Sequence, residues 1–216
     1  MEILNLYCGI GGNRKLWGNE HNITAVEMNR EIAKIYNDFF PNDCLIIGDA
    51  HEFLIKNFKE YDFIWSSPPC QSHSVCNHFL KGQGIIRYPD MALYQEIILL
   101  KHFFKGKYCI ENVKGYYNPL IKPQEIGRHY FWTNFFIPKI KIDYQIETMN
   151  RQASKDSQRK AIIREAQIPE FTDLLQINLM NKKLKNKRQV LRNCVLPKIG
   201  LHILNNINNT SQLKLL

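Results

Sequence analysis

Several features that mark other protein classes are missing from this sequence of 216 residues. It has no apolar run of the roughly eighteen residues that a membrane-spanning helix needs. The N-terminal stretch MEILNLYCGIGG has neither a basic region nor a cleavage signal, and it is typical of a strand that begins at once. Six cysteines form no CxxC pair, which argues against a zinc site or a disulfide framework. These absences predict a cytoplasmic protein without a membrane partner or a bound metal ion.

The positive charge is confined to the last third of the chain. Residues 1–138 hold 14 basic and 14 acidic residues, whereas residues 139–216 hold 15 and 6, which accounts for the whole formal charge of +9. Concentrated basic charge suggests a polyanionic partner such as nucleic acid. A solvated, lysine-rich helical face would give the same composition, so charge alone leaves both interpretations open.

Strands and helices alternate along the first 138 residues, and 44% of the chain is apolar, which suits one domain with a buried core. This alternation predicts an α/β fold, with a mostly parallel sheet covered by helices on both faces and ligands at the carboxyl ends of its strands. We expect strands at 2–7, 23–27, 44–49, 61–67, 107–113 and 129–137, and helices at 14–17, 29–40, 50–58, 89–104, 154–166 and near 171–179, followed by an amphipathic segment at 188–207.

A glycine turn and two acidic residues follow three successive predicted strands. The turn, residues 8–12 (CGIGG), would let backbone amides approach a ligand closely, and no GK[ST] follows it, which excludes a Walker loop. Glu27 ends the next strand, where a carboxylate can accept hydrogen bonds from ribose hydroxyls. Asp49 ends the third strand and is placed to meet an adenine amino group. Together they predict a site for a nucleoside-containing ligand.

The stretch SSPPCQSHS, residues 66–74, mounts Cys70 behind two prolines at the end of a predicted strand. A cysteine thiolate is a good nucleophile where its pKa is lowered. The alternative is a small buried hydrophobic residue, which is the usual state of a free cysteine. The position at a strand end favours a nucleophile. The remaining cysteines are interpreted as packing residues: Cys8, Cys44, Cys76, Cys109 and Cys194.

The fifth predicted strand ends in Glu111, Asn112 and Val113. A glutamate buried beside a cysteine would have a raised pKa and could donate a proton, whereas a glutamate exposed to water at a strand end is the simpler alternative. Arg128, at the start of the next strand, could orient that acid or a substrate carbonyl. Taken alone, Arg128 is better explained by a surface salt bridge.

The motifs LNLYCGIGG, SPPCQ, IENV and RNCVLPKIG, in this order, make the sequence resemble the cytosine-5 DNA methyltransferases of the compact phage or restriction-modification kind. The resemblance covers nearly the whole chain except roughly residues 139–180. It implies a Rossmann-like S-adenosylmethionine-dependent methyltransferase sheet. It also implies a catalytic and cofactor-binding domain at 1–138, a short basic target-recognition region at 139–187 and a C-terminal segment at 188–216 that returns to the catalytic domain.

The resemblance also implies a mechanism. The Cys70 thiolate would attack C6 of a flipped cytosine, Glu111 would protonate N3, and C5 would take the methyl group of S-adenosyl-L-methionine, leaving S-adenosyl-L-homocysteine. The loop from Gln71 to Arg87 would close over the base. Carried over by motif, the catalytic residues are Cys70, Glu111 and Arg128; the cofactor-binding residues are Tyr7, Gly9, Ile10, Gly11, Gly12, Glu27, Met28, Asp49, Ala50, Pro68, Asn193 and Val195; and the substrate-binding residues are Gln71, Ser72, Asn112, Val113 and Gln124.

Three departures from the family pattern affect the expected substrate contacts and the turn beside the cofactor. Ile126 stands where the family has an arginine, and Arg192 stands where it has a glycine. The recognition region is short, and its basic residues suit phosphate contacts better than base readout. These basic residues are Arg151, Lys155, Arg159, Lys160, Arg164 and those between Lys182 and Arg188. We therefore expect a short recognition sequence, strong salt dependence or help from another subunit.

The expected partners are double-stranded DNA and a cognate restriction endonuclease or partner subunit, in a bacterial or phage-encoded, nucleoid-associated protein. Two alternatives remain open. One is an RNA (tRNA) cytosine-5 methyltransferase that uses the same motifs. The other is a nucleic-acid-binding pseudoenzyme or partner subunit, although Cys70 and Glu111 count against it because a binding module needs neither.

Overall fold

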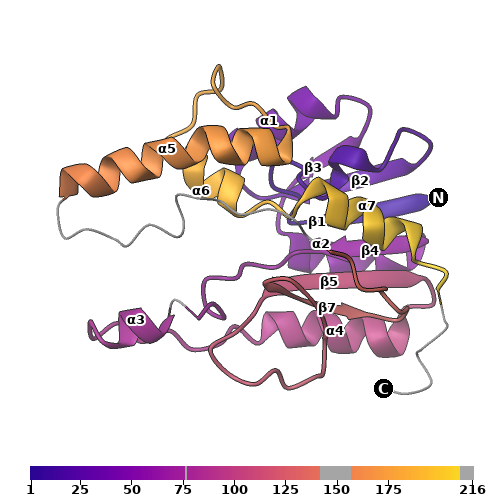
Figure 1. Ribbon diagram of the computed structural model, residues 1–216. Helices are drawn as coiled ribbons and strands as arrows, with labels where there is room; N and C mark the ends of the chain where they lie inside the picture. The colour runs from indigo at the N-terminus through magenta and orange to yellow at the C-terminus, as the bar shows by residue number, and fades with distance from the viewer. Residues whose placement is uncertain (76, 142–156, 210–216) are drawn as a thin grey trace.

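A seven-stranded sheet forms the centre of the protein in the computed structural model, which describes residues 1–75, 77–141 and 157–209 (Figure 1). The strand order is β3-β2-β1-β4-β5-β7-β6. The first five strands in this order pair in parallel, and β7 and β6 pair antiparallel. The bounds are β1 Glu2–Leu6, β2 Asn22–Glu27, β3 Cys44–Ile47, β4 Phe63–Ser66, β5 Lys107–Val113, β6 Gln124–Ile126 and β7 His129–Thr133.

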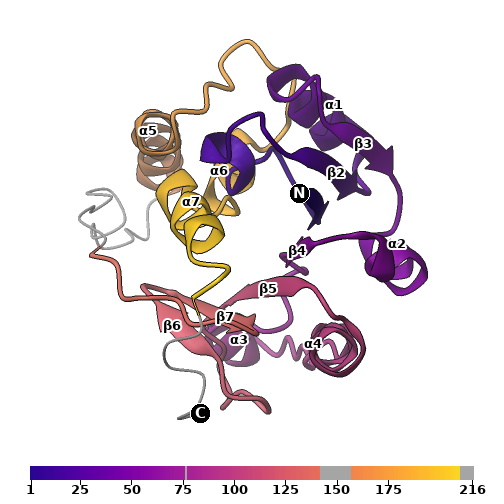
Figure 2. The same ribbon diagram turned by 90° about the vertical axis from the view of Figure 1, so that its right-hand side faces the viewer.

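Helices cover both faces of the sheet, which confirms the predicted α/β class (Figure 2). We call one side the α7 face; it is covered by α1 (Arg30–Phe39), α5 (Ser157–Leu175), α6 (Lys187–Arg192), α7 (Pro197–Asn205) and the short helix η1 (Arg14–Leu16). The other, the α4 face, is covered by α2 (Ala50–Asn57) and α4 (Ala92–Phe103). Two short helices, η2 (Phe58–Glu60) and α3 (Asn77–Lys81), complete the described elements.

Alternate side chains along each strand enter one or the other of two hydrophobic clusters. Trp65 and Cys109 pack on the α7 face, whereas their neighbours Ile64 and Ile110 pack on the α4 face. This is the period of two that a strand buried on both faces must show. The same alternation decides which strand-end side chains can meet, because residues two apart share a face.

The C-terminal helices lie against the glycine turn near the N-terminus. A Cβ atom on Gly12 would lie 2.7 Å from Cβ of Cys194 and from the carbonyl oxygen of Val195, and one on Gly200 would collide with the backbone of Asn13. Glycine at both positions therefore permits close backbone approach. The helix η1, which follows the turn, is pinned by a buried pair of hydrogen bonds from Arg14 to Asp43, of 2.9 and 3.0 Å.

The structure differs from the predicted elements at several points after β5. β6 was not predicted, because three residues are too few for a period to be visible. The two helices expected at 154–166 and near 171–179 are one helix, α5, which contains Pro169. The amphipathic segment expected at 188–207 is divided into α6 and α7, with Pro197 in the first turn of α7. Within the described residues, no helix combines the length and hydropathy needed to cross a bilayer.

Candidate active site

The glycine turn after β1 is held open by a carboxylate at the end of β2. The Gly9 amide donates to Oε2 of Glu27 at 3.1 Å, and the Asn29 amide donates to Oε1 at 2.8 Å. Gly9 and Gly11 have φ values of +55° and +81°, in the left-handed region that favours glycine. A Cβ on Gly9 would meet nothing within 4 Å, so the turn borders open space. A ligand can therefore approach this backbone closely.

The other residues predicted to bind the cofactor differ in how they face this space. Met28 and Asp49 are exposed at the ends of β2 and β3, and Asp49 also caps α2 by accepting from the Glu52 amide at 3.0 Å. Ile10 and Ala50 are buried in the core, so that only their backbone can face a ligand. The Tyr7 hydroxyl points inward and donates to Oε1 of Glu96 at 2.7 Å.

The closing motif meets the glycine turn, as the packing of Gly12 requires. Val195 is buried on the α7 face, and Asn193, the residue after α6, is exposed. Cys194 is half-buried beside Val195. Residues far apart in the sequence thus lie next to one another at the carboxyl ends of β1 and β2.

Cys70 lies in the loop after β4, and this loop is tied to the end of β5. Cys70 is half-buried, and its carbonyl oxygen accepts from the amides of His73 and Ser74, both at 3.0 Å. The buried Asn112 donates through Nδ2 to the carbonyl oxygen of Pro68 at 3.1 Å. The two motifs that carry the predicted nucleophile and acid are therefore joined by a direct hydrogen bond.

Glu111 is a buried acid with a raised pKa. Glu111 is 6% exposed, and this burial raises the pKa of its carboxyl from 4.5 to about 7. A hydrogen bond from Ser67 and the charge on Arg128 both lower the pKa, but by less than burial raises it. Ser67 is held in turn by Trp65, whose Nε1 donates to its hydroxyl oxygen at 2.8 Å. A carboxyl that is about half protonated near neutral pH can act as a general acid.

His129 contacts the same carboxyl without forming an ion pair. Its Nε2 lies 3.7 Å from Oε1 of Glu111, and burial, helped by the charge on Arg128, lowers the pKa of His129 to about 3. The imidazole is therefore neutral at physiological pH. Arg128 itself is exposed, and its Nη2 donates to the carbonyl oxygen of Arg192 at 3.2 Å. Its predicted role in orienting the acid or the substrate stays a prediction.

The predicted substrate-binding residues are partly engaged within the protein. Gln124 donates through Nε2 to Thr133 Oγ1 at 2.7 Å and to the Phe135 carbonyl at 2.8 Å, and so links β6 to the end of β7. The Ser72 hydroxyl accepts from the Asp90 amide at 3.2 Å. Exposed Gln71 and half-buried Val113 lie beside Cys70 and Asn112 in the chain. Ile126, which replaces a family arginine, is buried in the core on the α7 face.

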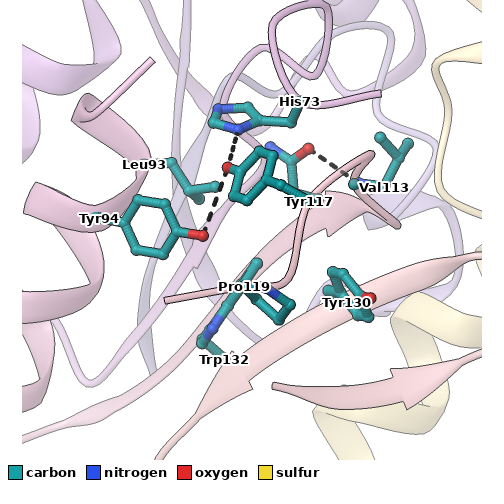
Figure 3. A pocket seen from close by; sticks show the side chains of 10 residues that line it. His73, Leu93, Tyr94, Val113, Tyr117, Pro119, Tyr130 and Trp132 are labelled. Carbon is teal, nitrogen blue, oxygen red and sulfur yellow. Dashed lines mark hydrogen bonds between the residues drawn. The ribbon is translucent and has the colours of Figure 1, made fainter. Parts of the chain in front are cut away.

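A small aromatic pocket on the α4 face anchors the loop that carries Cys70 (Figure 3). His73 is buried there, and its Nδ1 accepts from the Tyr117 hydroxyl at 2.6 Å, while the Tyr94 hydroxyl donates to Tyr117 at 3.4 Å. Burial lowers the pKa of His73, which suits an accepting, neutral ring. The pocket is lined by His73, Leu93, Tyr94, Asn112, Val113, Gly115, Tyr117, Pro119, Tyr130 and Trp132.

Several residues around the site were not predicted from the sequence: Ser67, His73, Glu96, Tyr117 and His129. One signal was available for Glu96, because it is a charged residue on the apolar stripe of α4 and is fully buried there. The interpretation of Cys8 and Cys109 as packing residues is confirmed, since both are buried. That of Cys44 is wrong, because β3 is an edge strand and Cys44 is exposed on it.

Part of the predicted recognition region cannot be placed in this site. Arg151 and Lys155 lie outside the described residues, and so do the side chains of residues 157–165, which include Arg159, Lys160 and Arg164. Cys76, which was interpreted as a packing residue, also lies outside the described residues. The described part of the region packs into the sheet's own core through Phe171 and Leu175. The predicted domain boundaries stay a prediction.

Comparisons with known proteins bear on this arrangement. No curated protein matches the chain. Among solved structures, a hypothetical protein from Thermus thermophilus is 15% identical with a TM-score of 0.44, over 61% of this chain and 73% of that one. A DNMT2 variant from Spodoptera frugiperda is 30% identical with a TM-score of 0.39, over 55% of this chain and 37% of that one. The methyltransferase EhMeth from Entamoeba histolytica is 17% identical with a TM-score of 0.35, over 52% and 38%.

The family comparison covers more than half of the sequence. The model for C-5 cytosine-specific DNA methylase matches residues 1–123, which include the glycine turn, Cys70 and Glu111. The seven-stranded sheet with helices on both faces agrees with the α/β fold expected from the family motifs. This chain therefore belongs to the C-5 cytosine-specific DNA methylase family.

Proposed function

We propose that this protein is a DNA (cytosine-5)-methyltransferase that acts through a covalent adduct between Cys70 and C6 of the target base. The observation that carries the proposal is the buried carboxyl of Glu111, with a pKa of about 7, in a strand end tied to the Cys70 loop by the bond from Asn112 to Pro68. Cytosine is a poor electrophile unless N3 is protonated, so the nucleophile needs an acid beside it. A binding module has no use for that pair.

Membership of a methyltransferase family implies a cofactor of the S-adenosylmethionine type, and the strand ends fit it. Glu27 is oriented by two backbone amides, and the Gly9 turn borders open space. These groups would hold the nucleoside part through ribose hydroxyls and close backbone approach, with exposed Met28 and Asp49 beside the adenine. When bound, S-adenosyl-L-methionine supplies an electrophilic methyl group on a sulfonium.

The chain's own residues supply the remaining chemistry. The Cys70 thiolate adds to C6, and the electron pair displaced into the ring is neutralised as the Glu111 carboxyl gives its proton to N3. This leaves C5 electron-rich and ready to take the methyl group. After transfer, C5 loses its proton to a solvent water, the Cys70 thiolate leaves C6 to restore the double bond, and the N3 proton returns to Glu111. The prolines before Cys70 restrict the loop that must hold the sulfur below the ring.

Basic surface near α6 supports nucleic acid as the substrate. Lys183 and Lys185 are exposed in the segment before α6, and the formal charge of the chain is +9. Such residues suit phosphate contacts, which make binding steeply salt-dependent. A base inside a duplex is out of reach of Cys70, so the target cytosine must be flipped out of the stack.

The test is bisulfite sequencing of plasmid and genomic DNA from cells that express the protein, with Cys70→Ala beside it. We expect protected cytosines in one short motif and none in the variant. Cys44→Ala is a matched control, because Cys44 is exposed on the edge strand β3, and it should protect the same cytosines. Unprotected DNA together with methylated cytosines in RNA would replace the DNA substrate by RNA. Full protection by Cys70→Ala would exclude the covalent mechanism.

A further inference from the structure

A carboxylate that the proposed chemistry does not use lies behind the site. Glu96 on α4 is 0% exposed. Its Oε1 accepts from the Tyr7 hydroxyl at 2.7 Å and lies 3.0 Å from Nδ1 of His51, and its Oε2 accepts from the Ser66 hydroxyl at 2.6 Å. A buried carboxylate is costly unless it is well hydrogen-bonded, and here three donors converge on it.

The three donors come from three different segments of the site. Tyr7 lies between β1 and the glycine turn, and Ser66 is the last residue of β4, before the segment that leads to Cys70. His51 is in the first turn of α2, two residues after Asp49. Each segment carries residues proposed to hold the cofactor or the target base. One side chain of α4 thus connects the methyl-donor side of the site with the nucleophile side.

The backbone of Tyr7 has a conformation that surrounding contacts must stabilise. Tyr7 has φ of +53°, a left-handed conformation that is uncommon for a bulky residue and costs free energy. Such a conformation persists where surrounding contacts determine it. The bond to Glu96 supplies one such contact, and burial together with the Glu96 charge raises the pKa of Tyr7, so that its hydroxyl remains a donor.

We propose that Glu96 is a positioning residue that couples the methyl-donor pocket to the catalytic loop, by holding the ends of β1 and β4 through Tyr7 and Ser66. The inference rests on the proposed function, because it assigns the two loops their roles. β1 and β4 are neighbouring parallel strands, with Leu6 opposite Ser66, so a shift of either strand end moves the turn at Gly9 and the loop of Cys70 relative to each other.

The test separates the two arms of this connection. Glu96→Gln keeps the shape and removes the charge. We expect the dissociation constant of S-adenosylhomocysteine to rise and kcat of methylation at saturating cofactor to fall, each by about tenfold or more. Tyr7→Phe should weaken S-adenosylhomocysteine binding. Ser66→Ala should lower kcat and change the dissociation constant of S-adenosylhomocysteine less than twofold, which corresponds to about 0.4 kcal/mol of binding free energy. Glu60→Gln, an exposed residue of η2, is the matched control with unchanged values.

A second readout shows whether the variant removes the contact itself. The hydrogen bond to Glu96 is the main cause of the raised pKa of His51, so in Glu96→Gln the His51 pKa measured by NMR should fall. A fallen His51 pKa with unchanged affinity and kcat would overturn the proposal. Should Glu96→Gln not fold, the two hydroxyl deletions carry the test, and equal effects of both on both parameters would contradict it. If the unaltered protein binds no S-adenosylhomocysteine, the proposed function itself has failed.

Discussion

Nε2 of His129 lies 3.7 Å from Oε1 of Glu111, and the two side chains share one face of the paired strands β5 and β7. Because burial lowers the pKa of His129 to about 3, the imidazole brings no positive charge to this contact. It therefore does not hold Glu111 in its ionised form, and burial raises the pKa of that carboxyl to about 7. The availability of the proton thus depends on a neutral histidine beside the acid.

The rate of methyl transfer should fall as the pH rises through about 7. In the proposed mechanism Glu111 acts in its protonated form, and its pKa of about 7 sets the point at which that form is lost. A pH profile of kcat/KM should show this falling limb, with about a tenfold loss per pH unit above it. In Glu111→Gln the rate should drop by about a hundredfold or more and the limb should vanish. A limb at the same pH in that variant would assign it to another group.

The same carboxyl should make the protein less stable as the pH rises. The folded pKa of Glu111, about 7, lies above its ordinary value of 4.5, so between these values the folded state keeps a proton that the unfolded state has lost. Stability from this group is present below pH 4.5 and is lost as the pH rises through 7, by up to about 3 kcal/mol. In urea unfolding, the free energy of unfolding of Glu111→Gln should therefore increase relative to that of the unaltered protein between pH 5 and pH 8. An equal difference at both pH values would contradict the raised pKa.

Gly12→Ala should destabilise the protein and weaken cofactor binding. The new Cβ would lie 2.7 Å from Cβ of Cys194 and from the Val195 carbonyl oxygen, so the closing motif must move away from the glycine turn. Overpacking of this kind costs about 1–3 kcal/mol. Gly48→Ala is the control, since a Cβ there meets nothing within 4 Å. Thermal unfolding and calorimetry with S-adenosylhomocysteine measure both effects, and equal stability of the two variants would disprove the close approach.

Tyr117→Phe should slow methylation without changing cofactor affinity. The variant removes the donor to Nδ1 of His73 and leaves a buried acceptor unpaired at a cost of about 1–3 kcal/mol, which loosens the loop of Cys70. The glycine turn and Glu27 are untouched. Tyr61 follows η2, at the opposite end of β4 from the Cys70 loop, so Tyr61→Phe is the control and should keep the full rate. Single-turnover rates and S-adenosylhomocysteine binding separate the outcomes, and weaker binding with an unchanged rate would refute the anchoring role.

The segments that form a sheet, and the edge at which their carboxyl ends meet, were predictable from residues alone. The runs at 2–7, 61–67 and 107–113 are apolar and short, and each ends in polar or unusual residues. In a parallel sheet these ends lie at one edge, so Gly9, Cys70 and Glu111 had to lie at that same edge. That conclusion needs only chain direction and the order of the motifs.

The orientation of individual side chains was decided by the tertiary structure. Glu111 and Asn112 are adjacent in sequence, yet Glu111 shares the α7 face with Phe131, whereas Asn112 turns to the α4 face and lines the pocket of Tyr94. A motif identifies the residues but does not say to which face of the sheet each side chain points. Likewise Cys44 is exposed because β3 is an edge strand, and the strand order depends on contacts between distant segments.

Local patterns by themselves determined that this chain forms an α/β sheet with Cys70 and Glu111 at its strand ends, because hydrophobic periodicity and turn residues act over a few neighbours. Only the tertiary structure decided the protonation of Glu111 and the partners of Glu96. Both depend on burial and on hydrogen-bond donors that lie tens of residues away in the chain. The free energy of a buried charge is set by the groups packed around it rather than by its sequence neighbours.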